Sequence, residues 1–236
     1  MIWRSNETKY VLLMLILAGV LGCRTGSDRA RSEEKEQIID VDGNLYNTIT
    51  IGDQVWMKEN LKTTRYNDGT PIPVVENYDE WAELTLPAYC WYNNDSLNGE
   101  EFGALYNGYV IESGNLCPEG WHVPTDEEWK ALETAVGGVD VAGGALKEAG
   151  TDFWKTPNTG ASNNSGFSAR PGGYRSYDGP FNLKRTYGFW WTSSLKSWYG
   201  APPRFLYREI RYNGQDIRMN ISEKGSGLSV RCIKNP

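Results

Sequence analysis

The sequence predicts an α+β fold with short antiparallel sheets, two or three short helices and long loops. Three observations support this class: a sharply capped helix after Pro124, a hairpin around Asn213-Gly214, and a long segment over residues 150–204. That segment is rich in Gly, Asn, Ser, Pro and Trp. Helical and strand patterns therefore occur in one chain, separated by turn residues and long connections, as expected of a mixed fold.

The clearest helix signal begins at Thr125. Glu128 follows three residues later, and the two form a capping box, in which each side chain accepts a hydrogen bond from the other residue's backbone N–H. Gly137-Gly138 then ends the helix. Between these ends, three apolar residues share one face: Trp129, Leu132 and Val136. The pattern predicts a short helix with one buried face.

Two weaker helices and a meander are also predicted. One helix begins at Asn77 and turns Trp81 inward, and another covers residues 139–149, although Gly143-Gly144 lowers its helix propensity. Before them, residues 38–57 alternate in polarity between two-residue turn signals. This alternation predicts a small antiparallel meander.

A hairpin near the C-terminus has a defined register. Asn213-Gly214 is the preferred type I′ turn, and its placement brings apolar residues together on one face and opposite charges together on the other. Arg208 falls opposite Met219 on the apolar face and is expected near the end of its strand. The polar side chains suit a solvated face better than a binding surface. The predicted pairs are Ile210 with Ile217, Leu206 with Ile221, Tyr207 with Asn220, Glu209 with Arg218, and Arg211 with Asp216.

The N-terminus carries a targeting segment. Arg4 and Lys9 precede an apolar run over residues 11–21, which is too short for a bilayer core of about 30 Å and fits a signal peptide. The run ends at Gly22-Cys23, which resembles a bacterial lipobox in which Cys23 receives lipid. We expect residues 1–22 to be a lipoprotein signal peptide. An ordinary secretory signal with a chance cysteine is the alternative.

Residues 23–37 are expected to comprise the lipidated cysteine and a flexible tether. They are polar and charged, with no apolar periodicity that could repay the entropy of ordering. Removal of residues 1–22 changes the formal charge of the chain from −6 to −7, since Arg4, Lys9 and Glu7 are lost. Because the chain is acidic and no basic stripe accompanies its aromatic residues, nucleic-acid binding is not expected.

A series of motifs is distributed along the chain. The motifs are Trp56-Met57-Lys58-Glu59-Asn60-Leu61, Tyr92-Asn93-Asn94-Asp95, Gly103-Ala104-Leu105-Tyr106, Val123-Pro124-Thr125-Asp126-Glu127-Glu128-Trp129, Gly166-Phe167-Ser168-Ala169-Arg170-Pro171-Gly172-Gly173, Trp190-Trp191-Thr192-Ser193-Ser194 and Ser229-Val230-Arg231-Cys232. With these motifs the chain resembles the Fibrobacter succinogenes major paralogous domain over residues 40–234, and residues 123–129 are more distantly similar to the Leu-Pro-Thr-x-x-Glu-Trp signature of formylglycine-generating, sulfatase-modifying domains. The resemblance implies that residues 38–236 form one domain with a C-type-lectin-like fold.

The resemblance also implies one disulfide. If Cys23 carries lipid, three cysteines are left in an oxidising compartment, and the family places Cys117 and Cys232 together at the base of the domain. We therefore expect a Cys117–Cys232 bridge and a buried thiol at Cys90. The alternative is a metal site built from these cysteines and His122, but the chain has no Cys-x-x-Cys or His-x-x-x-His spacing. No metal or other cofactor is expected.

The sequence offers little support for catalysis. His122 could act as a base beside Asp126 or Glu127, but a packed loop histidine is the favoured interpretation, since no nucleophile motif accompanies it. The formylglycine-generating domains hold copper with two cysteines near the C-terminus, where this chain has only Cys232. Calcium-dependent lectins use carboxylate motifs that this chain lacks, and Asp40-Val41-Asp42-Gly43 fits a turn better than a calcium loop.

Aromatic and polar side chains on the loops are therefore the candidates for ligand contact. Long loops within compact domains are usually functional, and aromatic rings with polar neighbours stack on sugars or anchor proteins. The alternative is that these rings pack against the undersides of the loops. The candidate ligand-binding residues are Trp198, Tyr199, Tyr177 and Tyr187 in the loops and Tyr207 and Arg211 on the hairpin.

These features predict an outer-membrane lipoprotein, facing the periplasm or the cell surface, that is not an enzyme. Lipid on Cys23 would hold it to the membrane, and the domain would bind a glycan or an envelope protein through its loop aromatics. A structural or assembly module of the envelope without a small ligand is the second interpretation. A formylglycine-generating-like enzyme is the third.

Overall fold

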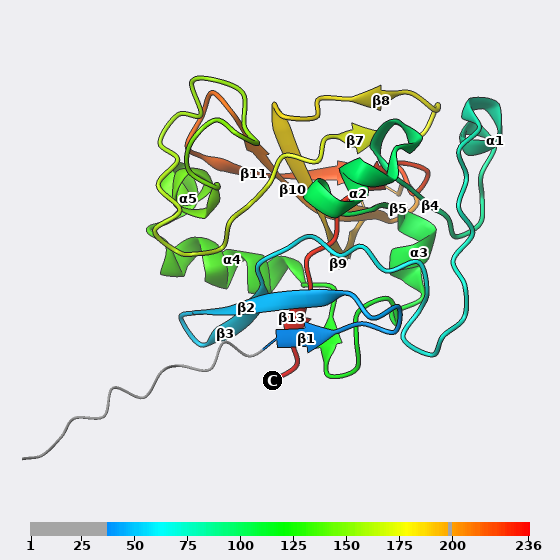
Figure 1. The fold of residues 1–236 in the computed structure, drawn as a ribbon, viewed down its shortest axis with the longest axis horizontal. Helices are drawn as coiled ribbons and strands as arrows, with labels where there is room; N and C mark the ends of the chain where they lie inside the picture. The colour runs from blue at the N-terminus through cyan, green and yellow to red at the C-terminus, as the bar shows by residue number, and fades with distance from the viewer. Residues whose placement is uncertain (1–36, 198–199) are drawn as a thin grey trace, which may run out of the picture. The chain divides into compact units, whose positions relative to one another are not determined.

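The computed structural model describes residues 37–197 and 200–236. The predicted signal peptide and three of the predicted site residues, Cys23, Trp198 and Tyr199, lie outside the described residues. Within them the chain forms three antiparallel sheets and five short α-helices (Figure 1). The predicted α+β class with short antiparallel sheets and long loops is confirmed, in an arrangement consistent with a C-type-lectin-like fold. Five helices occur rather than two or three, because some are too short to leave a periodic pattern.

The first sheet, the terminal sheet, brings the two ends of the domain together. Across the sheet its strands are β1 (Gln37–Ile39), β2 (Leu45–Ile51), β3 (Gln54–Met57), β13 (Ile233–Lys234) and β6 (Trp121–His122). Ile233 of β13 pairs with Trp56 on one side and with His122 on the other. The last strand of the chain is therefore held between the N-terminal meander and β6, and the predicted meander is confirmed.

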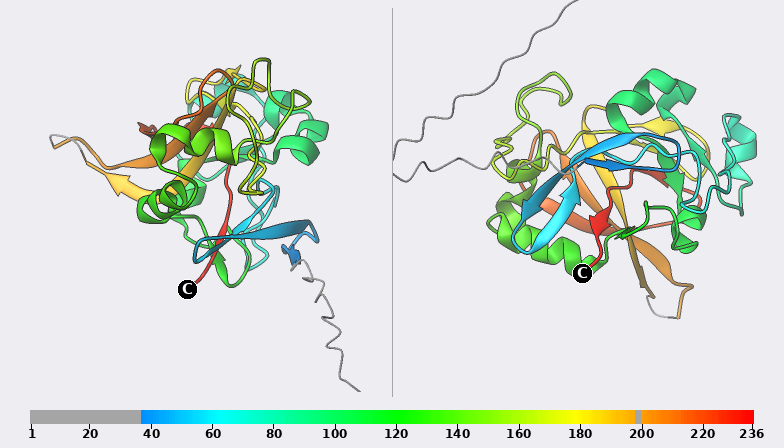
Figure 2. Two further views of the ribbon diagram at one scale, coloured as in Figure 1. Left: turned by 90° about the vertical axis from the view of Figure 1, so that its left-hand side faces the viewer. Right: turned by 60° about the horizontal axis from the view of Figure 1, so that its bottom comes forward.

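The second sheet, the hairpin sheet, consists of β9 (Tyr187–Lys196), β10 (Arg204–Arg211) and β11 (Ile217–Ser222), with β10 in the centre. The outer part of β9 and β10 projects beyond the body of the domain (Figure 2). Arg211 pairs with Asp216 at 3.0 Å as predicted, whereas Arg218 forms its ion pair with Asp216 rather than with Glu209. The predicted register of β10 and β11 is confirmed: Ile210 lies opposite Ile217, Glu209 opposite Arg218, Tyr207 opposite Asn220 and Leu206 opposite Ile221.

The third sheet, the loop sheet, joins segments that are far apart in the sequence. Across the sheet its strands are β4 (Tyr89–Cys90), β5 (Leu105–Asn107), β12 (Gly227–Leu228), β7 (Tyr174–Arg175) and β8 (Phe181–Asn182). The helices are α1 (Tyr78–Ala82), α2 (Ser96–Phe102), α3 (Gly108–Glu112), α4 (Asp126–Ala135) and α5 (Val139–Leu146), with a 3-10 turn η1 (Tyr92–Asn94) before α2.

The predicted helix caps are confirmed. The Thr125 hydroxyl accepts a hydrogen bond from the Glu128 N–H at 3.1 Å, and the Glu128 carboxylate accepts one from the Thr125 N–H at 2.8 Å. Asn77 caps α1 by accepting from the Glu80 N–H at 2.9 Å, and Trp81 is fully buried. Local polar side chains therefore set where these helices begin.

Helix α5 is three residues shorter than predicted. It ends at Leu146, and the backbone of Lys147 is extended. Gly143 and its neighbour are required by packing, because a Cβ on Gly143 would lie 2.3 Å from the Asp216 carbonyl oxygen. The glycine pair lowers helix propensity but lets α5 approach the backbone of the β10–β11 turn.

The expectation that Arg208 lies near a strand end is wrong. It occupies the middle of β10 and is buried, and its guanidinium forms ion pairs with Asp126 at 2.8 Å and Glu133 at 2.6 Å. Both carboxylates belong to α4. An arginine on the apolar face is tolerated there because a helix carrying two carboxylates covers that face.

Residues 150–204 form more of the core than expected from their composition. They contain β7, β8 and β9, and four of their aromatic side chains are fully buried. Ring contacts join Phe167 and Trp190 to Trp56 of the terminal sheet and Trp129 of α4, with neighbouring centroids 5.1–6.3 Å apart. The four buried side chains are Trp154, Phe167, Trp190 and Trp191.

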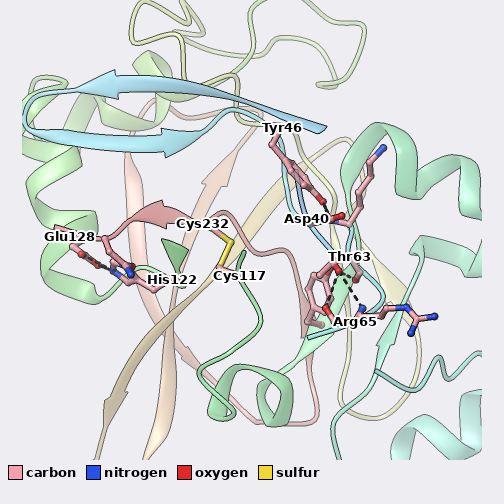
Figure 3. Close-up of a disulfide and its surroundings, with 11 residues drawn as sticks. Asp40, Tyr46, Thr63, Arg65, Cys117, His122, Glu128 and Cys232 are labelled. Carbon is pink, nitrogen blue, oxygen red and sulfur yellow. Dashed lines mark hydrogen bonds and ion pairs between the residues drawn. A yellow bond between two sulfur atoms is a disulfide. The ribbon is translucent and has the colours of Figure 1, made fainter. Parts of the chain in front are cut away.

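The predicted disulfide is confirmed. Cys117 and Cys232, which are 115 residues apart, are bonded and lie beside the terminal sheet (Figure 3). Cys90 is the free cysteine among the described residues, and it is buried as predicted. Burial raises the pKa of the Cys90 thiol to about 12, so the thiol is protonated at neutral pH.

Three further buried cations donate to backbone carbonyl groups of the loops. Lys147 Nζ donates to the carbonyls of Thr159, Gly214 and Arg211 at 2.8, 2.9 and 3.1 Å. Arg231 donates to the Phe167 and Ser168 carbonyls and to the side chain of Asn60. Arg175 likewise donates to backbone carbonyl groups of two other loops. Burial lowers the pKa of Lys147 to about 8 and that of Arg231 to about 9.

Replacement of both disulfide cysteines, Cys117→Ser with Cys232→Ser, is expected to lower the free energy of unfolding by up to about 4–5 kcal/mol, because closure of so long a loop restricts the unfolded chain. Denaturant unfolding with and without reductant measures the loss. Reductant should destabilise the parent protein and leave the double variant unchanged. Equal stability of the two oxidised proteins would contradict this expectation.

The Asp126–Arg208 pair should make stability depend on acid pH. Burial works to raise the pKa of Asp126, but hydrogen bonds from Lys130 and Arg208 outweigh it and lower the pKa below 3.8. Its stabilising contribution is therefore complete above pH 3.8 and lost as pH falls through the lowered pKa. At pH 7, Asp126→Asn should cost about 1.5–3 kcal/mol. Lys130→Ala, which removes the exposed partner, should cost less than about 1 kcal/mol.

Unfolding curves from pH 7 to pH 2 measure this dependence. The difference between the parent and Asp126→Asn should shrink below pH 3.8. A difference that stays constant down to pH 2 would refute the role of the pair.

Candidate functional site

An open groove of about 510 Å³ lies at the surface of the described domain. Its volume lies within the roughly 300–1,000 Å³ that is usual for ligand sites. Five separate segments contribute to it, so it exists only in the folded domain. The lining residues are Ala82, Leu84, Tyr109, Tyr177, Pro202, Pro203, Arg204, Glu223, Lys224 and Gly225.

One wall joins α3 to the segment after β11. Asn107 caps α3 by accepting from the Val110 N–H, which places Tyr109 in the first turn. The Gly108 N–H donates to the Lys224 carbonyl at 2.7 Å, and a Cβ on Gly108 would lie 2.9 Å from Lys224 Cα. Glycine at position 108 therefore lets residues 223–225 lie directly against α3.

The tight turn between β7 and β8 forms the adjoining part of the groove, where a Cβ on Gly225 would lie 3.1 Å from Tyr177 Cβ. The Ser176 N–H donates to the Pro180 carbonyl at 2.8 Å, and the Gly179 N–H donates to the Ser176 carbonyl at 3.0 Å. This turn presents Tyr177 with 55% of its surface exposed. Tyr78, which is 51% exposed, lies against Gly179, where a Cβ would be 2.8 Å from its ring. Tyr177 therefore lines the groove, and Tyr78 packs against the turn that carries it.

Arg175 fixes this turn from inside the protein. It is fully buried and donates to the carbonyls of Val75, Glu76 and Asn77 before α1 and to the carbonyl of Gly179 in the turn. Its guanidinium also stacks 4.3 Å from the centre of the Trp81 ring. One side chain thus links α1 to the turn that carries Tyr177.

The charges around the groove are matched. Arg204 forms an ion pair with Glu223 at 2.6 Å, and Lys224 forms one with Glu112 at 2.7 Å. The Lys224 ammonium also lies 5.8 Å from the centre of the Tyr109 ring. The groove therefore offers aromatic rings and charged hydrogen-bonding groups with little net charge.

Of the four predicted ligand residues that the structure describes, Tyr177 alone lines the groove. Tyr187 and Tyr207 are partly buried and both pack against Phe189, with ring centroids 5.7 and 5.8 Å away. Burial raises the pKa of Tyr207 to about 12. Arg211 is occupied by its pair with Asp216. Tyr187 and Tyr207 therefore pack beneath the loops, which was the alternative to ligand contact for these rings.

Most residues that line the groove could not be predicted from the sequence. Tyr109 follows the helix-capping Asn107 by two residues, and that position is the one local signal for it. Arg175 had no such signal, because three of its four carbonyl partners lie about 100 residues away. A groove built from five segments is a property of tertiary structure.

His122 does not have a free ring nitrogen. Nδ1 lies 2.7 Å from the Asn235 side-chain oxygen and Nε2 lies 2.9 Å from the Glu128 carboxylate (Figure 3). The partner carboxylate is therefore Glu128, the capping residue of α4, rather than Asp126 or Glu127. The contacts link Asn235, which follows β13, to the start of α4. The interpretation of His122 as a packed histidine agrees with them.

The predicted turn at residues 40–43 is also confirmed. The Gly43 N–H donates to the Asp40 carbonyl at 3.0 Å, and the Asp40 carboxylate accepts from the Tyr46 hydroxyl at 2.7 Å (Figure 3).

Over residues 37–197 and 200–236, no group of three or more His, Cys, Asp or Glu side chains is placed to hold a metal ion. No helix in these ranges is long and apolar enough to cross a membrane.

Comparison with known families agrees with the motifs. The model of the Fibrobacter succinogenes major domain matches residues 49–234, so the chain belongs to this family. No curated protein and no solved structure matches the chain. The more distant resemblance to formylglycine-generating domains stays a prediction.

Proposed function

We propose that this member of the Fibrobacter succinogenes major domain family is a non-catalytic recognition module of a cell-envelope lipoprotein, and that its groove binds a glycan. The observation that carries the proposal is the groove itself, with Tyr177 and Tyr109 beside two balanced ion pairs. A sugar ring offers an apolar C–H face for an aromatic ring and hydroxyl groups for charged side chains. Both kinds of contact are available at the groove.

The chemistry of the groove favours a glycan over a peptide anchored by charge. Each cation at its rim already has a carboxylate partner, so a strongly anionic or cationic ligand would have to displace an existing ion pair. A neutral sugar can hydrogen-bond to the paired groups without breaking them. Pro202 and Pro203 add a rigid apolar wall with no backbone donor of its own.

Two observations support a non-catalytic role. Both ring nitrogens of His122 are in contact with structural partners, which leaves no free imidazole for proton transfer. Cys232 is bonded to Cys117, so it is not available as a copper ligand of the kind that formylglycine-generating domains use.

The envelope location rests on the sequence and on the disulfide. The apolar run before Cys23 is typical of a lipoprotein signal, and lipid on Cys23 would attach the domain to the outer membrane. A disulfide that closes the domain suits an oxidising compartment such as the periplasm or the cell surface.

Binding of the mature chain in mild detergent to an array of plant and microbial glycans tests the proposal. We expect one class of neutral polysaccharide to bind, and Tyr177→Ala to weaken binding by about tenfold or more, since buried aromatic anchors usually contribute over 1 kcal/mol. Leu97→Ala is the control, because Leu97 is also exposed, at 74% of its surface, but lies on α2.

Absence of glycan binding, or binding that Tyr177→Ala leaves unchanged, would contradict the proposal. A stoichiometric envelope protein that co-purifies with the chain and is lost in Tyr177→Ala would instead identify the groove as an assembly surface.

A further inference from the structure

A small apolar face lies where the described domain begins. Ile39 and Leu45 form a direct cross-strand pair between β1 and β2, so their side chains point to the same side of the sheet. They are 60% and 57% exposed, and Val41 in the adjoining turn is 47% exposed. We propose that this β1 face, formed by Ile39, Val41 and Leu45, contacts the lipid surface to which the chain is anchored.

The exposure of these side chains follows from the local structure. Asp40, between Ile39 and Val41, is buried because its carboxylate accepts hydrogen bonds from the Asn44 N–H and the Tyr46 hydroxyl. Ile39 at the end of β1 and Val41 in the turn that follows flank the buried Asp40 and are themselves exposed. β1 is also the edge strand of the terminal sheet, where it pairs with β2 alone.

The occupant is inferred from the length of chain that precedes β1. Thirteen residues separate Cys23 from Gln37, and a random-coil chain of that length would have a mean end-to-end distance of about 20 Å. The inference rests on the proposed lipid anchor, which would keep β1 within that range of the bilayer. Tethering gives an effective concentration of about millimolar, so a few apolar side chains suffice for contact.

The polar surroundings indicate a surface without strong charge. Arg65 beside the face is already paired with Asp42 at 3.2 Å, and Asp40 and Glu119 are the other charged residues that line the adjoining hollow. Leu116 and Pro118 continue the apolar rim of this hollow of about 230 Å³. Because Arg65, the basic group among the described residues that line this hollow, is already paired, the face suits zwitterionic headgroups better than anionic ones.

Site-specific labelling of the full mature chain tests the inference. A polarity-sensitive fluorophore is attached to Leu45→Cys, and to Leu97→Cys on α2 as the control, in protein reconstituted into phosphatidylcholine vesicles. Cys90 is buried and does not compete for the label. We expect the label at position 45 to report an apolar environment and to be quenched by lipid-borne quenchers, and the label at position 97 to behave as in water.

A second variant separates apolar contact from mere proximity. Addition of Ile39→Ser and Val41→Ser should lower the ratio of lipid-contacting to free states roughly tenfold or more, as expected for two half-exposed aliphatic side chains. A label at position 45 that stays in a water-like environment on lipidated protein would overturn the inference. A shift that occurs without lipid and rises with protein concentration would overturn it too, in favour of a second copy.

Separate experiments test lipid attachment and glycan binding at the groove. A mature chain whose mass carries no acyl groups would overturn this inference together with the anchor. Glycan binding at the groove depends on Tyr177 and would be unaffected by the serine variants of the β1 face.

Discussion

Buried cations that donate to backbone carbonyls hold the loops of this domain in place. Sheets and helices satisfy their own backbone groups, but long coil segments do not, and each buried carbonyl without a donor costs about 1–3 kcal/mol. Arg175, Lys147 and Arg231 are all fully buried, and between them they donate to nine carbonyl groups of residues 75–77, 159–179 and 211–214. The backbone of these loops therefore folds around three buried, positively charged side chains.

This arrangement explains why a glycine-rich and asparagine-rich segment can form part of a core. A guanidinium carries five donors in a rigid plane, so it satisfies several carbonyls from different loops at once. Its faces are also apolar enough to stack on rings, and Arg175 lies between Trp81 and Phe181 while Arg231 lies over Phe167. The cations replace, in these regions, the hydrogen bonds that a regular strand or helix would supply.

The same interaction connects the fold to the groove. Because Arg175 holds both the start of α1 and the turn that carries Tyr177, the separation of these two segments is set by one side chain. The disulfide acts elsewhere, at the terminal sheet, where it closes the chain around residues 117–232. Different residues therefore close the domain and shape the groove: the disulfide closes the domain, and Arg175 shapes the groove.

The features that could be predicted from the sequence are local or were implied by family resemblance. The capping box at Thr125 and the register set by Asn213-Gly214 depend on residues within a few positions of one another, and both are confirmed. The cysteine bridge followed from the resemblance. Tyr177 was the one described candidate that lines the groove, because exposure of a single loop residue can be predicted but its neighbours in space cannot.

What could not be predicted is which cations are buried. Arg208 was expected at a strand end and Arg175 was given no role, since nothing near them in the sequence distinguishes them from exposed arginines. Their partners lie 75 and about 100 residues away. Long-range polar contacts of this kind have no periodic pattern, so hydrophobic periodicity and turn signals do not reveal them.

Hydrogen exchange of Arg175→Lys tests this account most directly. Lysine keeps the charge but lacks the planar fork that reaches four carbonyls. The account predicts faster exchange at the amides of Trp81 and Glu83 in α1 and of Ser176 and Gly179 in the turn, with the Trp129 amide of α4 unchanged. Unaltered protection of α1 and of the turn in a folded variant would contradict it.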